Sequence, residues 1–309
     1  MPPLVTIAIP CYNASQWIAA SVQSALDQTW PEKEIIVADD GSTDGTLDVL
    51  RKFGGAIRVE RAAHGGANRV RNLLLKAARG EWIQYLDADD YLRNEKIARQ
   101  FEEAGSAENA DVIYSPVLIE NWQDGHPLPL TPAPLDSSAD IYTQLLRWEL
   151  PQTSGALWRR QTLEAAGGWD EDPAQLCDEH DCYFRALKGG ARFVFAPTPN
   201  GVYRIWSEET RSYANQRPVI FSRTALCEAL RDWLEARSEW SAQHRDALGQ
   251  CFLEMARKLA SEDLKFARRY HAARKRDIRL AGPAAPLAYR VAYRTLGFGG
   301  AETLARSLR

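Results

Sequence analysis

Several features that would identify other classes of protein are missing from this sequence. The five cysteines are odd in number and none is spaced as Cys-x-x-Cys, which argues against a disulfide framework and a structural zinc site. No run of about 18 apolar residues is present. Residues 1–6 also lack the basic region and the following apolar core of a signal peptide. We therefore expect a cytoplasmic protein whose cysteines are buried as small apolar side chains.

The chain also has no strong overall charge, no internal repeat and no low-complexity tract. Of its 309 residues, 45% are hydrophobic and 26% are charged, a balance typical of a globular protein with one large domain or two ordinary ones. The net charge of −3 hides an asymmetry. Residues 265–309 contain eleven Lys or Arg and two acidic residues, which leaves −12 for residues 1–264. Because most of the chain is acidic, we expect no nucleic-acid partner.

Apolar runs of strand length alternate with helical patterns in the first hundred residues. The runs 4–9, 34–38, 57–60 and 82–86 predict strands, with helices between them. Strands joined by such helices form a mostly parallel sheet with helices on both faces, and ligands bind at the carboxyl ends of its strands. The sequence therefore predicts a Rossmann-like α/β fold with a binding site at that edge.

Three polar clusters, residues 10–13, 39–42 and 87–90, follow these strand ends. If the strands are neighbours in one parallel sheet, the clusters meet in one crevice. Asp87 and Asp89 are two residues apart, so an extended chain would point both carboxylates into the same volume. Hard divalent cations such as Mg²⁺ and Mn²⁺ prefer oxygen ligands. We therefore expect a metal site there, with a solvated acidic turn as the alternative.

The remainder of the chain changes character near residue 216. Before it, short strands and helices are expected; beyond it, the apolar pattern is wholly helical. We assign a nucleotide-binding half to about 1–105, an acceptor half to about 106–216, and a helical extension to 217–309. This division places a helix beginning at Ile141 in the acceptor half. The proline-rich stretch 123–138 predicts a loop near the site.

Taken together, six short motifs resemble those of the inverting, nucleotide-sugar-dependent glycosyltransferases of family two, which have the GT-A fold. The resemblance covers residues 5–212. The motifs are Ile9-Pro10-Cys11-Tyr12-Asn13, Asp39-Asp40-Gly41-Ser42-Thr43-Asp44, Arg71-Asn72, Leu86-Asp87-Ala88-Asp89-Asp90, Gly167-Gly168-Trp169-Asp170 and Tyr203-Arg204. The resemblance implies a hexosyltransferase that uses a nucleoside diphosphate sugar, with UDP favoured. Its acceptor would be a hydroxyl of a saccharide, a lipid-linked glycan or another carrier.

The resemblance also implies a role for each matched position. Asp89 would bind the Mn²⁺ or Mg²⁺ ion that bridges the diphosphate. No histidine ligand is expected, because Trp206 stands where some relatives have one. Trp206, with Trp158 and Trp169, would form an apolar face against the acceptor sugar or, alternatively, belong to the core. The residues expected to line the donor pocket are Pro10, Tyr12, Asn13, Asp40, Arg71 and Asp87.

Three positions in these motifs have a structural alternative. Asn13 and Asp39 could be turn or cap residues, and Arg71 could be a surface residue of its helix. A different activity of the same fold, nucleotidyl transfer, is disfavoured because residues 10–15 contain neither a Gly-rich loop nor a basic side chain.

The general base is expected in the segment Asp178-Glu179-His180-Asp181. The resembling family usually supplies the base from a Glu-Asp pair in which the Asp is the base, and here the order is reversed. Alignment puts Glu179 at the base position, with Asp178 as the alternative. The remaining possibilities on this acceptor side are that Asp181 is the base or that these acids cap the helix. The reversed pair also leaves open a sugar- or nucleotide-binding scaffold that has lost turnover.

The basic segment 265–309 carries a separate expectation. Six Lys or Arg between Arg268 and Arg279 precede a Tyr- and Leu-bearing stretch after Pro286. Such a segment could dock peripherally on the inner face of an anionic membrane. It could equally form solvated helices packed on the catalytic domain or on a partner.

Overall fold

The computed structural model describes residues 1–105, 110–172, 176–206 and 216–308. The chain forms two compact units, Met1–Ser137 with Leu150–Glu208 and Ser138–Glu149 with Glu209–Arg309. The expected division at residue 216 differs from this one, because residues 138–149 belong to the second unit. The last part of the resembling segment, residues 207–212, lies outside the described residues.

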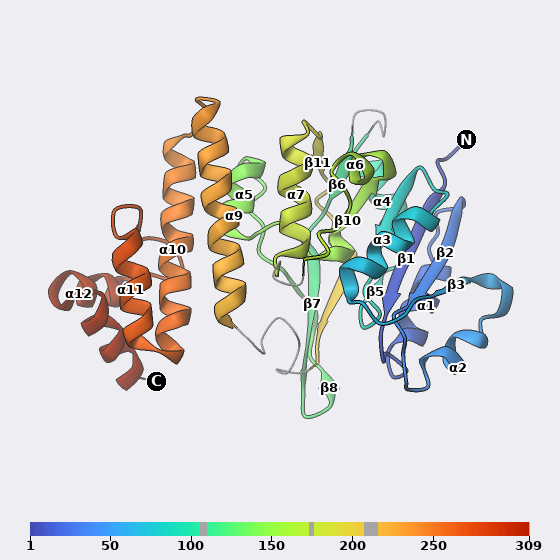
Figure 1. The fold of residues 1–309 in the computed structure, drawn as a ribbon, viewed down its shortest axis with the longest axis horizontal. Helices are drawn as coiled ribbons and strands as arrows, with labels where there is room; N and C mark the ends of the chain where they lie inside the picture. Colours follow the sequence, from blue (N-terminus) through green and yellow to red (C-terminus); the bar gives the residue numbers. More distant parts are fainter. Residues whose placement is uncertain (106–109, 173–175, 207–215, 309) are drawn as a thin grey trace. The chain divides into compact units, whose positions relative to one another are not determined.

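The first unit is built on a seven-stranded sheet (Figure 1). Its strands, in spatial order, are β11 (Phe193–Phe195), β6 (Val112–Tyr114), β10 (Ala156–Arg159), β4 (Trp82–Tyr85), β1 (Val5–Cys11), β2 (Lys33–Asp39) and β3 (Arg58–Arg61). β1 pairs in parallel with β2 and β4, and β2 pairs in parallel with β3. β10 runs antiparallel to both β4 and β6, so the sheet is mostly but not wholly parallel.

Helices cover this sheet, and their apolar sides supply the core. Along the chain the helical elements are α1 (Ile18–Leu26), α2 (Thr46–Arg51), η1 (Gly54–Ala56), α3 (Ala67–Ala77), α4 (Lys96–Glu103), η3 (Thr153–Gly155), α6 (Arg160–Ala165) and α7 (Asp178–Lys188). All seven residues of β1 are buried, as expected for a central strand with helices on both faces. Ile7 and Ile9 share one core cluster with Ile18 and Val22 of α1. The mixed α/β fold predicted from the apolar runs is confirmed.

A smaller, five-stranded sheet belongs to the same unit. Its members are β5 (Tyr91–Leu92), β12 (Gly201–Ile205), β7 (Val117–Gln123), β8 (His126–Pro127) and β9 (Thr131–Pro132). β7 and β12 are at predicted strands, whereas the short strands β5, β8 and β9 are not predicted from the sequence. The stretch 123–138, expected to be a loop, thus contains two short strands that pair with β7. Pro127 and Pro132 lie in these short strands, where proline is tolerated because an edge position requires fewer ladder hydrogen bonds.

The second unit is helical. Its helices are α5 (Ile141–Arg147), α9 (Gln216–Ala236), α10 (Ala242–Glu262), α11 (Leu264–Arg274) and α12 (Leu287–Ser307). In Figure 1 its helix α5 is green and its other helices are orange to red. The two expected apolar stripes lie inside, with Leu230 and Leu234 of α9 and Phe252 and Leu259 of α10 buried. α5 belongs here because Asp140, its N-cap, lies 3.1 Å from the Nε2 of His244 at the start of α10. None of the described helices is long and apolar enough to span a bilayer.

One lysine of the first unit is fully buried, and its amine donates to an amide rather than to a carboxylate within the described residues. Lys96, the first residue of α4, is 0% exposed and its Nζ donates a hydrogen bond to Oε1 of Gln84 on β4. Burial lowers the pKa of the Lys96 amine well below its usual range, because the charged form loses its hydration. The folded state therefore binds the proton less readily than the unfolded chain does.

We expect Lys96→Met to change how stability depends on pH. As the pH falls from about 10 toward the lowered pKa, the wild type loses about 1.4 kcal/mol of unfolding free energy per pH unit from this group, because the unfolded lysine takes up the proton first. The variant lacks that term but leaves Gln84 without its donor, which costs about 1–3 kcal/mol. Urea unfolding between about pH 7 and pH 9 measures both terms.

The matched control is Lys52→Met, at an exposed lysine near the end of α2. Its unfolding free energy should follow that of the wild type at every pH. Parallel pH curves for Lys96→Met and the wild type would contradict a neutral buried amine.

Candidate functional site

The predicted polar clusters lie at one edge of the sheet because β4, β1 and β2 are adjacent and parallel. The first two clusters are joined directly: the backbone N–H of Asn13 donates to Oγ of Ser42 at 2.9 Å, and the N–H of Asp40 donates to the carbonyl of Cys11 at 2.8 Å. The third follows β4, where the N–H of Leu86 donates to the carbonyl of Ala8 at 3.0 Å. The strand ends therefore bring the three clusters together, as their order in the sequence predicts.

After β1, the side chains of Tyr12 and Asn13 have different surroundings. Tyr12 is 46% exposed, and its ring stacks on His64 with the centroids 4.2 Å apart. Asn13 has a positive φ of 47°, and its Oδ1 accepts a hydrogen bond from the N–H of Thr43 at 2.8 Å. Asn13 is thus a turn residue that holds the loop after β2. Pro10 is buried within β1, and Tyr12 presents an exposed aromatic ring.

Asp40 holds a neighbouring loop with both of its carboxylate oxygens. Oδ1 accepts a hydrogen bond from the N–H of Gly65 at 2.8 Å, and Oδ2 accepts one from the N–H of Gly66 at 2.9 Å. The Nδ1 of His64 lies 3.0 Å from Oδ2, and the Asp40 side chain is 4% exposed. Gly66 has a φ of +93°, which favours glycine. Asp40 thereby places the His64 ring beside Tyr12; its predicted contact with the base or ribose stays a prediction.

The acidic segment after β4 is a turn, so the condition of an extended chain, under which Asp87 and Asp89 would point into the same volume, is not met. The N–H of Asp90 donates to the carbonyl of Asp87 at 3.0 Å, and residues 88 and 89 form the turn. The three carboxylates consequently meet different partners. Asp87 binds Nη2 of Arg71 at 2.8 Å, Oδ2 of Asp89 accepts from Nε1 of Trp206 at 3.1 Å, and Oδ1 of Asp90 accepts from the N–H of Arg204 at 2.9 Å.

The charge of this turn suits a divalent cation. Burial and, to a smaller extent, the negative charge of Asp87 raise the pKa of the Asp89 carboxyl. Burial and the negative charges of Asp89 and Asp87 raise the pKa of the Asp90 carboxyl well above its usual range. Oδ2 of Asp90 is buried without a hydrogen-bond partner. Excess negative charge with an unsatisfied oxygen fits a hard cation. No group of three His, Cys, Asp or Glu side chains able to hold a metal occurs in the described chain, so further ligands would come from substrate and water.

Arg71 lies between two acidic segments that are far apart in the sequence. It is 6% exposed, which rules out the surface-residue alternative. Its Nη2 binds Asp87 after β4, and its Nη1 lies 3.5 Å from Oδ2 of Asp178 at the start of α7. Its guanidinium lies 4.6 Å from the ring centroid of Trp169. Nδ2 of Asn68 also donates to Asp178, at 3.0 Å. One buried cation thus connects the strand-end acids with the predicted base segment.

Within that segment the two candidate bases have unlike surroundings. Asp178 is held by Arg71 and Asn68, whereas Oε1 of Glu179 accepts one hydrogen bond, from Oγ1 of Thr153 at 2.5 Å. Burial raises the pKa of the Glu179 carboxyl, the charge of Arg71 opposes this rise, and the charges of Asp178 and Asp87 add to it. A carboxylate with raised pKa takes up a proton more readily, which suits a general base.

The remaining acid of this segment points into its own helix. Oδ2 of Asp181 lies 2.7 Å from Nη2 of Arg185, one turn further along α7. The N-cap of α7 is Cys177, which makes no side-chain capping bond, so neither Asp178 nor Glu179 serves as the cap residue. All three acids lie in the first turn, where the helix dipole favours negative charge.

Two of the three expected acceptor-side tryptophans are in the core. Trp158 is 2% exposed because β10 lies between β4 and β6, and its ring stacks on Tyr183 at 5.2 Å. Trp169 is also 2% exposed, packed against Arg71 and against Tyr85 at 5.1 Å. The acceptor role predicted for these two side chains is therefore incorrect: neither presents a ring face to solvent.

Trp206 is the exception, and it has aromatic neighbours that the sequence does not identify. It is 41% exposed beside Asp89, with the ring of Trp17 at 5.5 Å; Trp17 in turn contacts Trp122 at 5.3 Å. Arg204, a matched motif residue, pairs with Glu120 on the adjacent strand β7 at 3.2 Å. Trp17 is the N-cap of α1, Trp122 lies in β7 and Trp206 follows β12, so only the fold reveals that these three form one aromatic wall.

Comparison with known proteins is consistent with this geometry. The family model described as "Glycosyl transferase family 2" matches residues 6–156. The putative teichuronic acid biosynthesis glycosyltransferase TuaG of Bacillus subtilis is 37% identical over 107 residues, 32% of this chain and 41% of that protein. The UDP-Glc:alpha-D-GlcNAc-diphosphoundecaprenol beta-1,3-glucosyltransferase WfaP of Escherichia coli is 43% identical over 99 residues, 31% of this chain and 39% of that protein. The chain thus spans about two fifths of the length of these relatives.

Solved structures of similar fold cover most of the chain at low identity. Residues 1–349 of Staphylococcus aureus TarS, in complex with UDP-GlcNAc, match with a TM-score of 0.56 and 18% identity over 89% of this chain and 88% of that one. The mannosyltransferase PcManGT from Pyrobaculum calidifontis, in complex with GDP-Man and Mn²⁺, matches with a TM-score of 0.57 and 19% identity over 100% of this chain and 87% of that one. These likenesses establish the GT-A fold.

Proposed function

The chain belongs to glycosyltransferase family 2 through residues 6–156, and we propose that it transfers a sugar from a nucleoside diphosphate sugar to a hydroxyl group with inversion. The observation that carries the proposal is the position of Arg71, whose guanidinium binds Asp87 beside the donor edge and Asp178 beside Glu179. One side chain thereby holds the acid proposed for the donor close to the segment proposed for the acceptor. A one-step displacement requires this closeness, because the donor-side and acceptor-side groups act at the same anomeric carbon.

The donor binds, in this proposal, across the ends of β1, β2 and β4. Tyr12 offers an exposed ring for the base, and the loop anchored by Asp40 carries His64 alongside it. Asp87 accepts hydrogen bonds from ribose or sugar hydroxyls, as carboxylates at this edge of α/β sheets commonly do. We favour UDP as the nucleotide, since TarS was solved with UDP-GlcNAc and the name of WfaP gives UDP-Glc as its donor; PcManGT, with GDP-Man, is the contrary example.

The metal in this proposal is Mn²⁺ or Mg²⁺, and Asp89 would hold it. When bound, such an ion neutralises the negative charge that grows on the leaving diphosphate. Asp90 supports the turn through Arg204, and the indole of Trp206 orients the Asp89 carboxylate by its hydrogen bond.

Glu179 acts as the general base. Its carboxylate takes the proton of the acceptor hydroxyl while the hydroxyl oxygen attacks the anomeric carbon from the side opposite the diphosphate, which inverts the configuration. Thr153 orients the carboxylate through its hydroxyl. The acceptor is a hydroxyl of a saccharide, a lipid-linked glycan or another carrier, and the exposed ring of Trp206 provides an apolar surface on which a sugar can stack. Cytoplasmic localisation remains a prediction from the sequence.

Asp89→Ala is expected to weaken metal-dependent nucleotide binding by about 100-fold or more, because the carboxylate that would hold the ion is gone. Isothermal titration with UDP in the presence and absence of Mn²⁺ measures this directly. Asp89→Asn is the matched variant, since it keeps an acceptor for the Trp206 indole and removes only the charge. If both variants bind UDP and Mn²⁺ as the wild type does, the metal is held elsewhere.

A binding scaffold of the same fold is the competing function, since the order of Asp178 and Glu179 is reversed relative to the usual pair. A product assay with several UDP-sugars and saccharide acceptors separates the two functions. Donor binding without any transferred sugar, and without metal-dependent hydrolysis of the donor, would favour the scaffold.

A further inference from the structure

α12 of the second unit is fixed in place by its inner side. The hydroxyl of Tyr289 donates to Oε1 of Glu302 at 2.6 Å, and the guanidinium of Arg257 lies 3.9 Å from the Tyr289 ring centroid. The hydroxyl of Tyr293 lies 2.6 Å from Nε2 of His271 on α11. These contacts define which side of the helix is turned outward. The first turns of α12, residues 287–296, therefore expose a stable surface.

The outward side of these turns is apolar. Leu287 is 75% exposed and Val291 is 57% exposed, and because they are four residues apart they lie on one side of the helix. Leu296, also 57% exposed, ends this part of the helix before Gly297, whose φ of 67° interrupts the helical geometry. One apolar side of this helix packs against the unit and the other is exposed to solvent. The exposed apolar side is available for a further contact.

The charges around this apolar surface are positive. No acidic residue occurs between Ile278 and Ala301, whereas Arg290 and Arg294 lie three residues beyond Leu287 and Val291. Neither arginine forms an ion pair with a carboxylate of the described chain; Nε of Arg290 donates a hydrogen bond to the carbonyl of Ala285 at 2.6 Å, and no acid neutralises its guanidinium there. Arg268, Arg269, Lys275 and Arg276 add positive charge from α11 and the residues after it.

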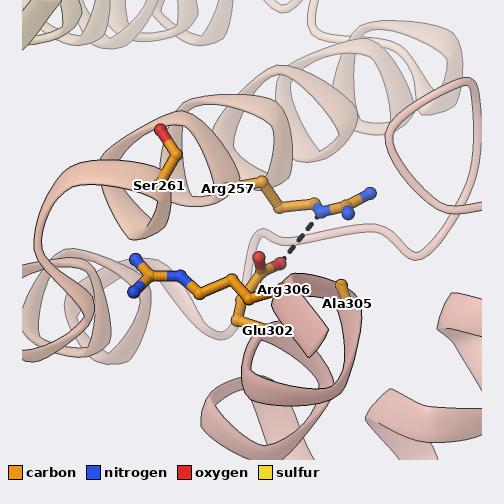
Figure 2. A pocket seen from close by; sticks show the side chains of 5 residues that line it. All are labelled: Arg257, Ser261, Glu302, Ala305 and Arg306. Atoms are coloured by element: carbon orange, nitrogen blue, oxygen red, sulfur yellow. Dashed lines mark hydrogen bonds and ion pairs between the residues drawn. The ribbon is translucent and has the colours of Figure 1, made fainter. Parts of the chain in front are cut away.

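The one acidic residue of α12 does not offset this charge. Glu302 borders a cavity of about 180 Å³ together with Arg257, Ser261, Ala305 and Arg306. Figure 2 shows Glu302 between the two arginines and joined to Arg257, at a distance of 2.9 Å. Its carboxylate is only 6% exposed and is already bonded to Arg257 and Tyr289. The outer surface of α12 therefore remains basic and apolar.

We propose that residues 287–296 of α12 dock on an anionic lipid bilayer, with Leu287 and Val291 among the acyl chains and Arg290 and Arg294 at the lipid phosphates. Arginine side chains suit this position because their apolar stems reach along the helix while the guanidinium stays at the headgroups. A second copy of the chain is a poorer occupant, because a symmetric contact would place the same arginines opposite one another. Docking does not depend on sugar transfer and is tested separately from it.

The test is flotation of the full chain with two kinds of vesicle at low salt, phosphatidylcholine alone and phosphatidylcholine mixed with phosphatidylglycerol. The wild type should float with the mixed vesicles only, and high salt should release it. Arg290→Gln with Arg294→Gln should weaken binding about 25-fold, at about fivefold for each charge. Leu287→Glu with Val291→Glu should weaken it by about 100-fold or more.

The matched control is Leu128→Glu with Leu130→Glu, which removes two leucines that are 43% and 39% exposed in the first unit. It should float as the wild type does. The proposal is overturned if the wild type stays at the bottom of the gradient, if it floats equally with uncharged vesicles, or if the Leu287 and Val291 variant still floats. A concentration-dependent dimer that this variant abolishes would instead assign the surface to a second copy. Circular dichroism checks that each variant is folded; should the glutamate pair unfold, the arginine pair still decides.

Discussion

Replacing Glu179 with Gln is expected to lower kcat by about 10² to 10⁴-fold while the affinity for the donor stays near that of the wild type. Glutamine has the shape of glutamate and can still accept the hydrogen bond from Thr153, but it cannot take the acceptor proton. The donor-side acids are untouched, since Asp87 is held by Arg71 rather than by Glu179. Initial rates with a UDP-sugar, together with UDP titration calorimetry, measure the two quantities independently.

Two neighbouring acids provide the controls. Asp181→Asn loses an ion pair with Arg185 inside α7 and should keep a kcat close to that of the wild type. Asp178→Asn should mainly weaken the contact with Arg71. If Asp178→Asn stops transfer and Glu179→Gln does not, Asp178 is the base.

The same carboxylate predicts the acid limb of the pH–rate profile. Because burial raises the pKa of Glu179, the proton remains on it up to a higher pH than on an ordinary carboxylate. As the pH falls through that raised pKa, kcat/KM should fall tenfold per pH unit, and Glu179→Gln should lack this limb.

Arg71→Met is expected to lower the free energy of unfolding by about 3–5 kcal/mol, because it leaves charges in a buried region without their partner. Arg71 is 6% exposed, and its guanidinium binds Asp87 and Asp178 and packs on the Trp169 ring. Methionine fills part of the volume but supplies neither the charge nor the donors. Urea denaturation followed by circular dichroism measures the loss.

Arg69→Met is the matched control, an exposed arginine two residues earlier on α3, and should change stability by no more than about 0.5 kcal/mol. Arg71→Lys should lie between the two, since an ammonium keeps the charge but cannot direct two fixed donors at two carboxylates. If the Arg71→Met protein is as stable as the wild type, Asp87 and Asp178 are solvated and their contacts with Arg71 do not contribute to stability.

The sequence predicts the part of the fold that depends on local pattern. β1 and β2 are recognisable because continuous apolar runs of strand length suit a sheet buried on both faces. α5 is recognisable as a helix, but its place in the second unit depends on Asp140 meeting His244, about a hundred residues away. The strands β8 and β9 are hidden by their prolines, which are acceptable only because those strands pair on a single side.

The candidate site shows the same limit residue by residue. The order of the motifs correctly brings residues 10–13 and 39–42 together, since that depends only on parallel strands. The order of letters in Asp178-Glu179 cannot say which carboxylate is neutralised, because Arg71, 107 residues earlier, decides it. Likewise Trp158 and Trp206 look alike in the sequence, and only the position of β10 between two other strands buries the first.

The shared guanidinium of Arg71 has a consequence for substrate binding. Asp87 and Asp178 share the hydrogen-bond donors of Arg71. A ligand hydroxyl that donates to Asp87 would compete with Arg71 for that carboxylate. The charge of Arg71 would then act more strongly on Asp178 and Glu179. In the proposed function, donor binding at Asp87 would thereby change the charge that acts on Glu179, the proposed base. Because such linkage is reciprocal, binding of the acceptor beside Glu179 should in turn change the affinity for the donor.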